Sequence, residues 1–217
     1  MTIAAVFFDA GETLIDETRM WQGWANYLGV AWGDFSAAFD AVIAEGQHHR
    51  ETFERLRPGF DFTNALADRD RLHTTYRYER RDLYPDAEAC LSALSQQGLF
   101  VGIAGNQSEQ AQADLEALGL DVDLITTSAK LGAEKPSAEF YRRLLAAAGF
   151  EATESLYVGD RVDNDVVPAR AYGMKTALLR RGPWGRHHAG LPGAALADLR
   201  LNNLAELPNQ LTKLRGN

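Results

Sequence analysis

Ile3-Ala-Ala-Val-Phe-Phe-Asp-Ala-Gly-Glu-Thr13 is the stretch that decides the fold. Residues 3–8 are all apolar and include β-branched and aromatic side chains, which is typical of a strand buried on both faces. An acidic residue, Asp9, ends this run and a polar turn follows it. In an open parallel sheet, ligands bind outside the carboxyl ends of the strands. Asp9 is therefore expected to stand at a binding edge.

Similar apolar runs recur along the chain and alternate with helical patterns. Further strands are predicted over residues 99–104, 123–127, 155–158 and 175–179. Helices are predicted over residues 87–97, 108–118, 137–148 and 164–172, each followed by a glycine. This alternation implies a parallel sheet with helices on both faces. The predicted fold class is α/β, with a Rossmann-like three-layer core. A loop and a short helix over residues 204–214 are expected to end the chain.

Residues 16–84 interrupt this alternation. The segment contains no convincing strand, and its apolar residues recur at helical spacing, as in Trp21, Trp24 and Leu28. Tyr84-Pro85-Asp86 indicates the return to the sheet. We therefore predict a Rossmann-like core of residues 1–15 and 85–217, with a helical domain of residues 16–84 inserted after the first strand.

Composition narrows the class of protein and the cellular compartment that we expect. The 217 residues are 46% hydrophobic and 24% charged, as in ordinary globular proteins. Cys90 is the single cysteine, which excludes a disulfide framework and a cysteine-based zinc site and favours a reducing compartment. The apolar run of residues 3–8 is too short for a membrane span or the apolar region of a signal peptide. A cytoplasmic location is the resulting expectation.

The net charge of −8 limits the partners. It disfavours nucleic acid and anionic membranes, so neither is expected as a partner. A small anionic substrate responds to the local field instead, and remains compatible with this charge. The sequence does not indicate the oligomeric state.

Four charged residues are predicted to converge at the carboxyl edge of the sheet. Asp9, Asp160 and Asp165 follow two of the strands, and Lys135 precedes a helix. Acidic residues over 163–165 also suit a helix N-terminus, but that explains Asp160 less well. Clustered carboxylates repel unless a cation lies among them, and an oxygen-only ligand set suits Mg²⁺. A metal beside a free carboxylate indicates attack on a phosphoryl group.

The arrangement resembles the haloacid dehalogenase (HAD)-like hydrolase superfamily over nearly the whole chain. Four segments, in order, resemble its four motifs: Phe7-Phe8-Asp9-Ala10-Gly11-Glu12-Thr13-Leu14, Ile103-Ala104-Gly105-Asn106, Lys135-Pro136, and Gly159-Asp160 through Asn164-Asp165. Residues 16–84 resemble the cap that some members carry after the first strand. The resemblance implies a phosphatase that acts on a small phosphorylated metabolite through an aspartyl-phosphate intermediate, with Mg²⁺ as cofactor.

The resemblance also implies the roles of individual residues. Asp9 would be the nucleophile and a metal ligand, and the Gly11 carbonyl would bind the same metal. Asp160 would bind it directly and Asp165 through water. Lys135 would neutralise the nucleophile and the transferred phosphoryl group. Phosphate oxygens would be held at Gly105, Asn106 and Gln107.

Two positions depart from the family pattern. Gly11 stands where the phosphatases usually carry a second Asp that protonates the leaving group, a role worth about 10²–10⁴-fold in rate. Glu12 is expected to point elsewhere on an extended turn, which leaves Asp16 or a cap residue as possible substitutes. Gly105 stands where a Ser or Thr usually binds phosphate, so one hydrogen bond is lost unless Gln107 or Ser108 supplies it.

These departures leave alternatives to an ordinary phosphoric monoester hydrolase. An acyl phosphate hydrolase needs no leaving-group acid. A 2-haloacid dehalogenase also lacks the second Asp and needs no metal, although an aromatic residue usually stands at the Gly11 position. A third alternative is a catalytically degenerate member that only binds a phosphorylated ligand. The family's phosphonate hydrolases use a cap lysine, and residues 16–84 contain none.

Overall fold

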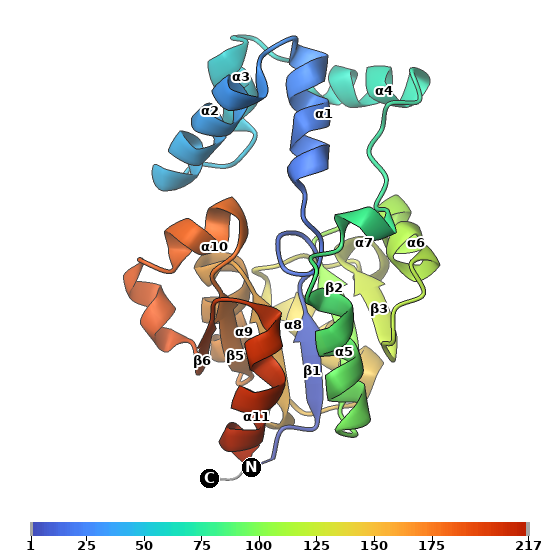
Figure 1. The fold of residues 1–217 in the computed structure, drawn as a ribbon, viewed down its shortest axis with the longest axis vertical. Coiled ribbons are helices and arrows are strands. Elements are labelled where there is room, and N and C mark those ends of the chain that lie inside the picture. Colours follow the sequence, from blue (N-terminus) through green and yellow to red (C-terminus); the bar gives the residue numbers. More distant parts are fainter. Residues whose placement is uncertain (1, 216–217) are drawn as a thin grey trace. The chain divides into compact units, whose positions relative to one another are not determined.

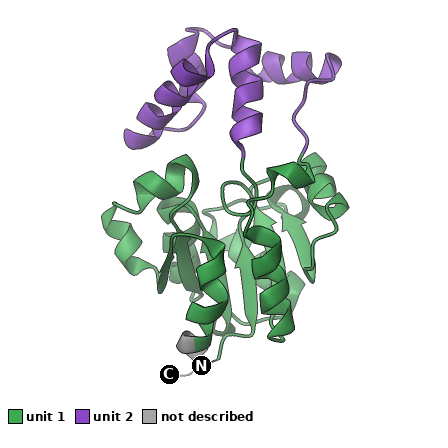
Figure 2. Cartoon of the chain, viewed as in Figure 1, with its two compact units in different colours: residues 1–16, 78–217 green, residues 17–77 purple. Residues whose placement is uncertain are grey.

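The computed structural model describes residues 2–215. The chain forms two compact units: unit 1 comprises residues 1–16 and 78–217, and unit 2 comprises residues 17–77 (Figure 2). Residues 78–84, which the sequence pattern placed in the insert, lie in unit 1. There the Tyr84 N–H donates to the Leu14 carbonyl at 2.9 Å. The segment that follows β1 (Ala5–Phe8) is thereby joined to the residues that lead back into unit 1.

A six-stranded parallel sheet forms the centre of unit 1 (Figure 1). Its order is β3-β2-β1-β4-β5-β6, and the strands are β1 (Ala5–Phe8), β2 (Phe100–Gly105), β3 (Leu124–Thr127), β4 (Ser155–Gly159), β5 (Lys175–Leu179) and β6 (Leu199–Leu201). Phe8 pairs with Ile103 on one side and with Val158 on the other. The end of β1 therefore lies between the ends of β2 and β4.

Apolar side chains of the strands fill a core on each face of this sheet. On one face, Val6 and Phe8 pack in a cluster with side chains of α5 (Ala87–Gln96), α6 (Glu109–Ala117) and α11 (Leu207–Arg215). On the other face, Ala5 and Phe7 pack with side chains of α8 (Ala138–Ala148) and α9 (Val167–Ala171). Alternate residues of β1 thus enter opposite cores, as the pleat of a strand requires. The predicted α/β fold with three layers is confirmed.

Local capping explains where the helices begin. The Ser108 hydroxyl accepts from the Ala111 N–H at the start of α6, and the Ser137 hydroxyl accepts from the Glu139 N–H at the start of α8. Both are ordinary N-caps. The helix predicted over residues 164–172 is instead a π-helical turn, η3 (Val162–Val166), followed by α9.

Several short elements were not predicted. They are α7 (Ser128–Leu131), α10 (Gly182–His188), β6 and the short helices η1 (Arg80–Asp82), η2 (Ala152–Glu154) and η4 (Pro192–Leu196), whereas the helix predicted over residues 204–214 is present as η5 (Leu204–Glu206) followed by α11. Each unpredicted element is too short to show a hydrophobic period in the sequence.

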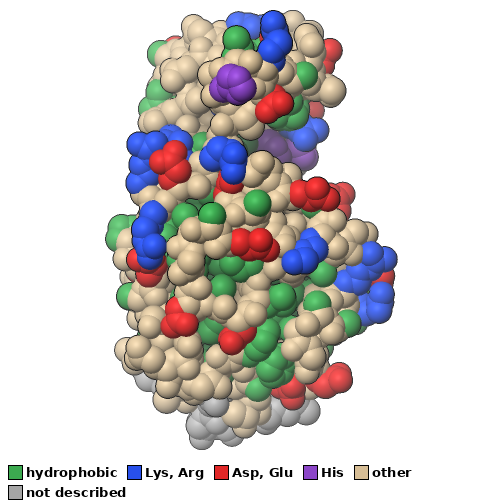
Figure 3. All heavy atoms as spheres, turned by 90° about the vertical axis from the view of Figure 1, so that its right-hand side faces the viewer, with side chains coloured by type: hydrophobic (Ala, Val, Ile, Leu, Met, Phe, Trp, Pro, Cys, Tyr) green, Lys and Arg blue, Asp and Glu red, His purple; other side chains and the backbone are tan. Residues whose placement is uncertain are grey.

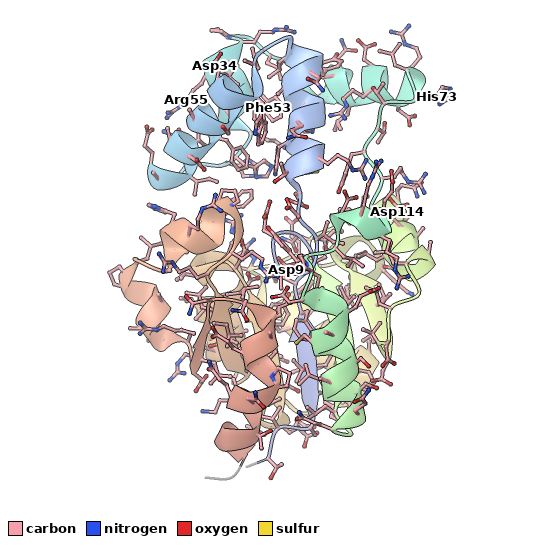
Figure 4. The ribbon with its side chains drawn as sticks, viewed as in Figure 1. Asp9, Asp34, Phe53, Arg55, His73 and Asp114 are labelled. Atoms are coloured by element: carbon pink, nitrogen blue, oxygen red, sulfur yellow. The ribbon has the colours of Figure 1, made fainter. Side chains whose placement is uncertain are left out.

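Unit 2 consists of helices around an aromatic core. The helices are α1 (Thr18–Leu28), α2 (Trp32–Ala44), α3 (Glu51–Leu56) and α4 (Phe62–Arg71). The Trp24 ring lies 5.0 Å from the rings of both Phe53 and Phe62, centroid to centroid. The guanidinium of Arg69 lies over the Trp24 ring at 4.2 Å. Phe53 points into this helical cluster in Figure 4. These aromatic residues are therefore needed for the packing of unit 2 itself.

The charged side chains on the face in Figure 3 are interspersed, with basic groups beside acidic ones. Among the exposed ion pairs of unit 1 are Arg80 with Glu88 and Lys175 with Asp198. Among residues 2–215, no helix is both long enough and apolar enough to cross a bilayer.

Candidate active site

Lys135 joins two carboxylates at the carboxyl edge of the sheet. Asp9 follows β1, and its backbone N–H still donates to the Val158 carbonyl of β4 at 2.8 Å. The Lys135 ammonium lies 2.8 Å from Asp9 Oδ1 and 2.7 Å from Asp165 Oδ1. All three side chains are nearly excluded from solvent. Figure 4 shows Asp9 at the end of its strand, facing away from the body of the sheet.

Two glycines at strand ends leave room for these carboxylates. A Cβ atom on Gly105, the last residue of β2, would lie 2.2 Å from Asp9 Oδ1. A Cβ atom on Gly159, the last residue of β4, would lie 2.2 Å from Asp165 Oδ2. Any larger residue at either position would displace a carboxylate. In this structure the side chains of Asp9 and Gln107 occupy the space that a Ser or Thr side chain at position 105 would fill.

Asn106 fixes the position of Lys135. Its side-chain amide donates to the Lys135 carbonyl at 2.9 Å, and its side-chain oxygen accepts from the Lys135 N–H at 2.8 Å. The side chain predicted to hold phosphate thus contacts the backbone of the lysine with both of its polar ends. Asn106 thus positions the segment that carries Lys135.

Asp160 completes a cluster of three carboxylates. Asp9, Asp160 and Asp165 each offer one oxygen atom, and these atoms all lie within 4.8 Å of one another. Burial raises the pKa of Asp160 well above its ordinary value, and the charges of Asp165 and Asp9 raise it further. Burial also raises the pKa of Asp9, which Lys135 partly offsets. If all three carboxylates were ionised, their negative charge would exceed the single positive charge of Lys135.

One atom of this cluster indicates directly what could bind there. Asp160 Oδ2 is buried, and no residue in the described part of the chain donates a hydrogen bond to it. A buried carboxylate oxygen without a partner is costly. Hard divalent cations take oxygen ligands of this kind. The residues present therefore fit a Mg²⁺ ion.

The turn after Asp9 is left-handed at Glu12, where φ is 55°. This differs from the extended turn expected from the sequence. Glu12 is buried, and its Oε2 accepts from the Tyr84 hydroxyl at 2.7 Å. A Cβ atom on Gly182 would meet the Glu12 carboxylate at 2.4 Å, so this side chain occupies space beside the loop after β5. Glu12 is directed toward that loop and Tyr84.

Arg181, which the sequence analysis did not single out, also contacts this turn. Its guanidinium donates to the Thr13 carbonyl at 3.0 Å, pairs with Asp86, and lies 4.1 Å above the Tyr84 ring. These contacts join residues far apart in the chain and leave no periodic pattern in the sequence. The one sequence feature that could have pointed to Arg181 is the pair Arg180-Arg181, which directly follows a predicted strand.

The geometry can now be compared with known proteins. Residues 3–173 match the family of haloacid dehalogenase-like hydrolases. The chain belongs to this family. Over 126 residues it is 38% identical to a ribulose-1,5-bisphosphate 5-phosphatase of Halopiger xanaduensis, a match that covers 57% of this chain and 51% of that protein. The chain thus spans about half the length of that relative.

Two further comparisons cover more of the chain. A phosphoserine phosphatase of Thermus thermophilus is 32% identical over 195 residues, which cover 84% of this chain and 78% of that one. A crystallised HAD hydrolase of Bacillus subtilis, bound to magnesium, superimposes with a TM-score of 0.67 at 19% identity, over 97% of this chain and 99% of that one. This second likeness concerns the fold alone.

Proposed function

We propose that this HAD-family member is a Mg²⁺-dependent phosphoryl hydrolase that acts on a small phosphorylated metabolite. The observation that carries the proposal is the buried pair of Asp9 and Lys135 beside two further carboxylates. The charge of the Lys135 ammonium favours the ionised form of Asp9, which is the form that attacks phosphorus, and the ion pair holds that carboxylate in place. The phosphatase names of the two curated relatives support this class of reaction.

The proposed reaction has two steps. An Asp9 carboxylate oxygen attacks phosphorus, the bond from phosphorus to the leaving oxygen breaks, and an aspartyl phosphate forms. Water then attacks the phosphorus, which releases phosphate and a proton and regenerates Asp9. Lys135 offsets negative charge on the nucleophile in both steps.

The side chains of Asp9, Asp160 and Asp165 and the carbonyl of Gly11 would hold Mg²⁺. When bound, this ion would supply positive charge to the phosphate oxygens. Around it, Asp165 is fixed by the Arg161 N–H, which donates to its Oδ2 at 2.9 Å. Phosphate oxygens would lie against the end of β2, at Gly105, Asn106 and Gln107.

Gly11 determines which substrates we expect. It cannot protonate a leaving group, and the nearby Glu12 carboxylate accepts from Tyr84 instead. The carboxylate of an acyl phosphate and the phenolate of an aryl phosphate leave without protonation, whereas the alkoxide of an alkyl phosphate needs an acid to protonate it. We therefore propose a preference for good leaving groups. A reducing cytoplasmic setting remains part of the proposal because the chain has a single cysteine, Cys90.

The test is a comparison of acetyl phosphate, p-nitrophenyl phosphate and glycerol phosphate with and without Mg²⁺. We expect the first two to be hydrolysed faster than the third, and only with Mg²⁺. Asp9→Asn should lower kcat by at least about 10³-fold, because it removes the nucleophile without changing its shape. Asp121→Asn, the same change at an exposed position after α6, should have no effect.

Other results would favour the alternatives. Equal rates on glycerol phosphate and acetyl phosphate would contradict the leaving-group preference. Chloride release from 2-chloropropionate without Mg²⁺ would indicate a dehalogenase. Mg²⁺-dependent binding of phosphate with no turnover of any substrate would indicate a degenerate member that only binds its ligand.

A further inference from the structure

The end of β2 is short of a phosphate-binding side chain, because Gly105 has none. The inference that follows rests on the proposed function, since it concerns how the same site holds a phosphoryl group. Three polar residues follow Gly105 directly, namely Asn106, Gln107 and Ser108. The structure distinguishes among them by what each side chain already contacts.

Asn106 and Ser108 have other tasks. Both polar ends of the Asn106 side chain contact the backbone of Lys135. The Ser108 hydroxyl accepts from the Ala111 N–H and caps α6, at an exposed position. Neither side chain can turn toward Asp9 without giving up a contact that shapes the site.

Gln107 lies over Gly105 beside the nucleophile. The point where a Gly105 Cβ would stand is 2.4 Å from Gln107 Oε1 and 2.2 Å from Asp9 Oδ1. The carboxamide of Gln107 therefore occupies the space of the missing side chain. Its backbone is anchored there, because the Gln107 carbonyl accepts from the Ser128 hydroxyl at 3.3 Å and its N–H donates to the Gly105 carbonyl at 3.1 Å.

The carboxamide also has unused hydrogen-bonding capacity. Gln107 Oε1 is buried, and no residue between 2 and 215 donates to it. A half-turn of the carboxamide exchanges Oε1 with Nε2 and leaves its shape unchanged. That half-turn brings an N–H donor to the place beside Asp9 Oδ1, where an acceptor oxygen alone would face a carboxylate.

We propose that the Gln107 carboxamide donates to the phosphoryl group at Asp9 and replaces the side chain that Gly105 lacks. Before substrate binds, the same N–H is available to the Asp9 carboxylate. Once phosphorus is bonded to Asp9, a phosphoryl oxygen becomes the acceptor. Gly105 and Gln107 thus form a matched pair, in which the small residue makes room for the long one.

The test compares Gln107→Ala and Gln107→Glu with the wild-type protein. Binding of inorganic phosphate with Mg²⁺ is measured by isothermal titration calorimetry, and turnover of acetyl phosphate by steady-state kinetics. Loss of a hydrogen bond to a charged group should raise the Kd of phosphate and the KM of acetyl phosphate about 10- to 100-fold in Gln107→Ala. Gln107→Glu should bind phosphate more weakly still, because a carboxylate repels it.

Gln110→Ala is the matched control. Its side chain is exposed in the same segment and donates to Asp114 Oδ1 at 3.1 Å, so phosphate binding should not change. Unaltered phosphate binding in Gln107→Ala, with or without a fall in kcat, would overturn the proposal. Gln107→Glu keeps the side-chain volume, and its thermal unfolding shows whether the fold is intact.

The two proposals can fail separately. If the wild-type protein hydrolyses none of the substrates but Gln107→Ala still loses phosphate affinity, the proposed hydrolase function is wrong and Gln107 remains a phosphate ligand. If the wild-type protein hydrolyses acetyl phosphate and Gln107→Ala binds phosphate equally well, the function stands and the role of Gln107 is wrong.

Discussion

Two clusters of three charges have central residues four positions apart in the chain, Lys135 and Glu139, and similar nitrogen–oxygen distances. Lys135 stands between Asp9 and Asp165, with nitrogen–oxygen distances of 2.8 and 2.7 Å. Glu139, on α8, stands between Arg142 and Arg143, each with a nitrogen–oxygen distance of 2.6 Å. The difference is exposure, because the Lys135 side chain is 2% exposed and that of Glu139 is 38% exposed.

Burial changes what each cluster does. At Lys135, burial alone would lower the pKa of the ammonium, but Asp165 and Asp9 outweigh it and raise that pKa. At Glu139, hydrogen bonds from Arg142 and Arg143 lower the pKa of the carboxyl to about 2. Water screens the exposed charges, so their mutual attraction adds little to stability. Short ion-pair distances alone therefore do not identify a site.

The largest effect should come from Lys135→Met, which leaves buried carboxylates without their cation. Breaking a buried ion pair in this way typically costs about 3–5 kcal/mol. We expect the free energy of unfolding in urea to fall by that amount, and acetyl phosphate turnover to be lost.

The matched control is Lys175→Met, since Lys175 pairs with Asp198 at 2.8 Å but is 47% exposed. Its cost should be about 1 kcal/mol or less. Equal losses of stability in the two variants would show that burial does not decide how much an ion pair contributes.

An intermediate effect, opposite in sign, is expected for Asp160→Asn without metal. This substitution removes a charge from a carboxylate whose Oδ2 is buried and receives no hydrogen bond from any described residue. In EDTA the variant should be more stable to urea than the wild-type protein by about 1–3 kcal/mol. With Mg²⁺ at about 100 times its Kd, only the wild-type protein should gain stability, by about 2.7 kcal/mol. A variant that is less stable than the wild-type protein in EDTA would contradict this account of the cluster.

The sequence predicted which charged residues would meet, because strand ends and a sheet edge follow from simple periodicity. Asp9, Asp160, Asp165 and Lys135 lie within one cluster in the structure, as expected. The α/β sheet followed from the same alternation of strands and helices. The short strand β6 did not, because the alternation of three residues, Leu199-Arg200-Leu201, is too short to identify a strand.

The contacts that shape the site were harder to predict. Gly105 makes room for Asp9 because a Cβ atom at position 105 would lie only 2.2 Å from Asp9 Oδ1. No sequence pattern encodes such a distance. The contact between Arg181 and the Thr13 carbonyl spans 168 residues and joins two loops. The sequence presented Gly105 only as a lost hydrogen bond, whereas the structure shows the space that this glycine leaves for Asp9 and Gln107.

The smallest effect should come from Glu139→Gln. Because the pKa of Glu139 is lowered from 4.5 to about 2, its charge stabilises the folded state above pH 4.5, and this contribution is lost as the pH falls toward 2. We expect thermal unfolding midpoints of variant and wild-type protein to agree within error at 0.15 M salt and pH 7, because salt and water screen the exposed pairs. At low salt and pH 7 a small deficit in the variant should become measurable, and it should vanish when both proteins are compared near pH 2. A deficit as large as that of Lys135→Met, or one that grows as the pH falls, would mean that the exposed cluster stabilises α8 by something other than the charge of Glu139.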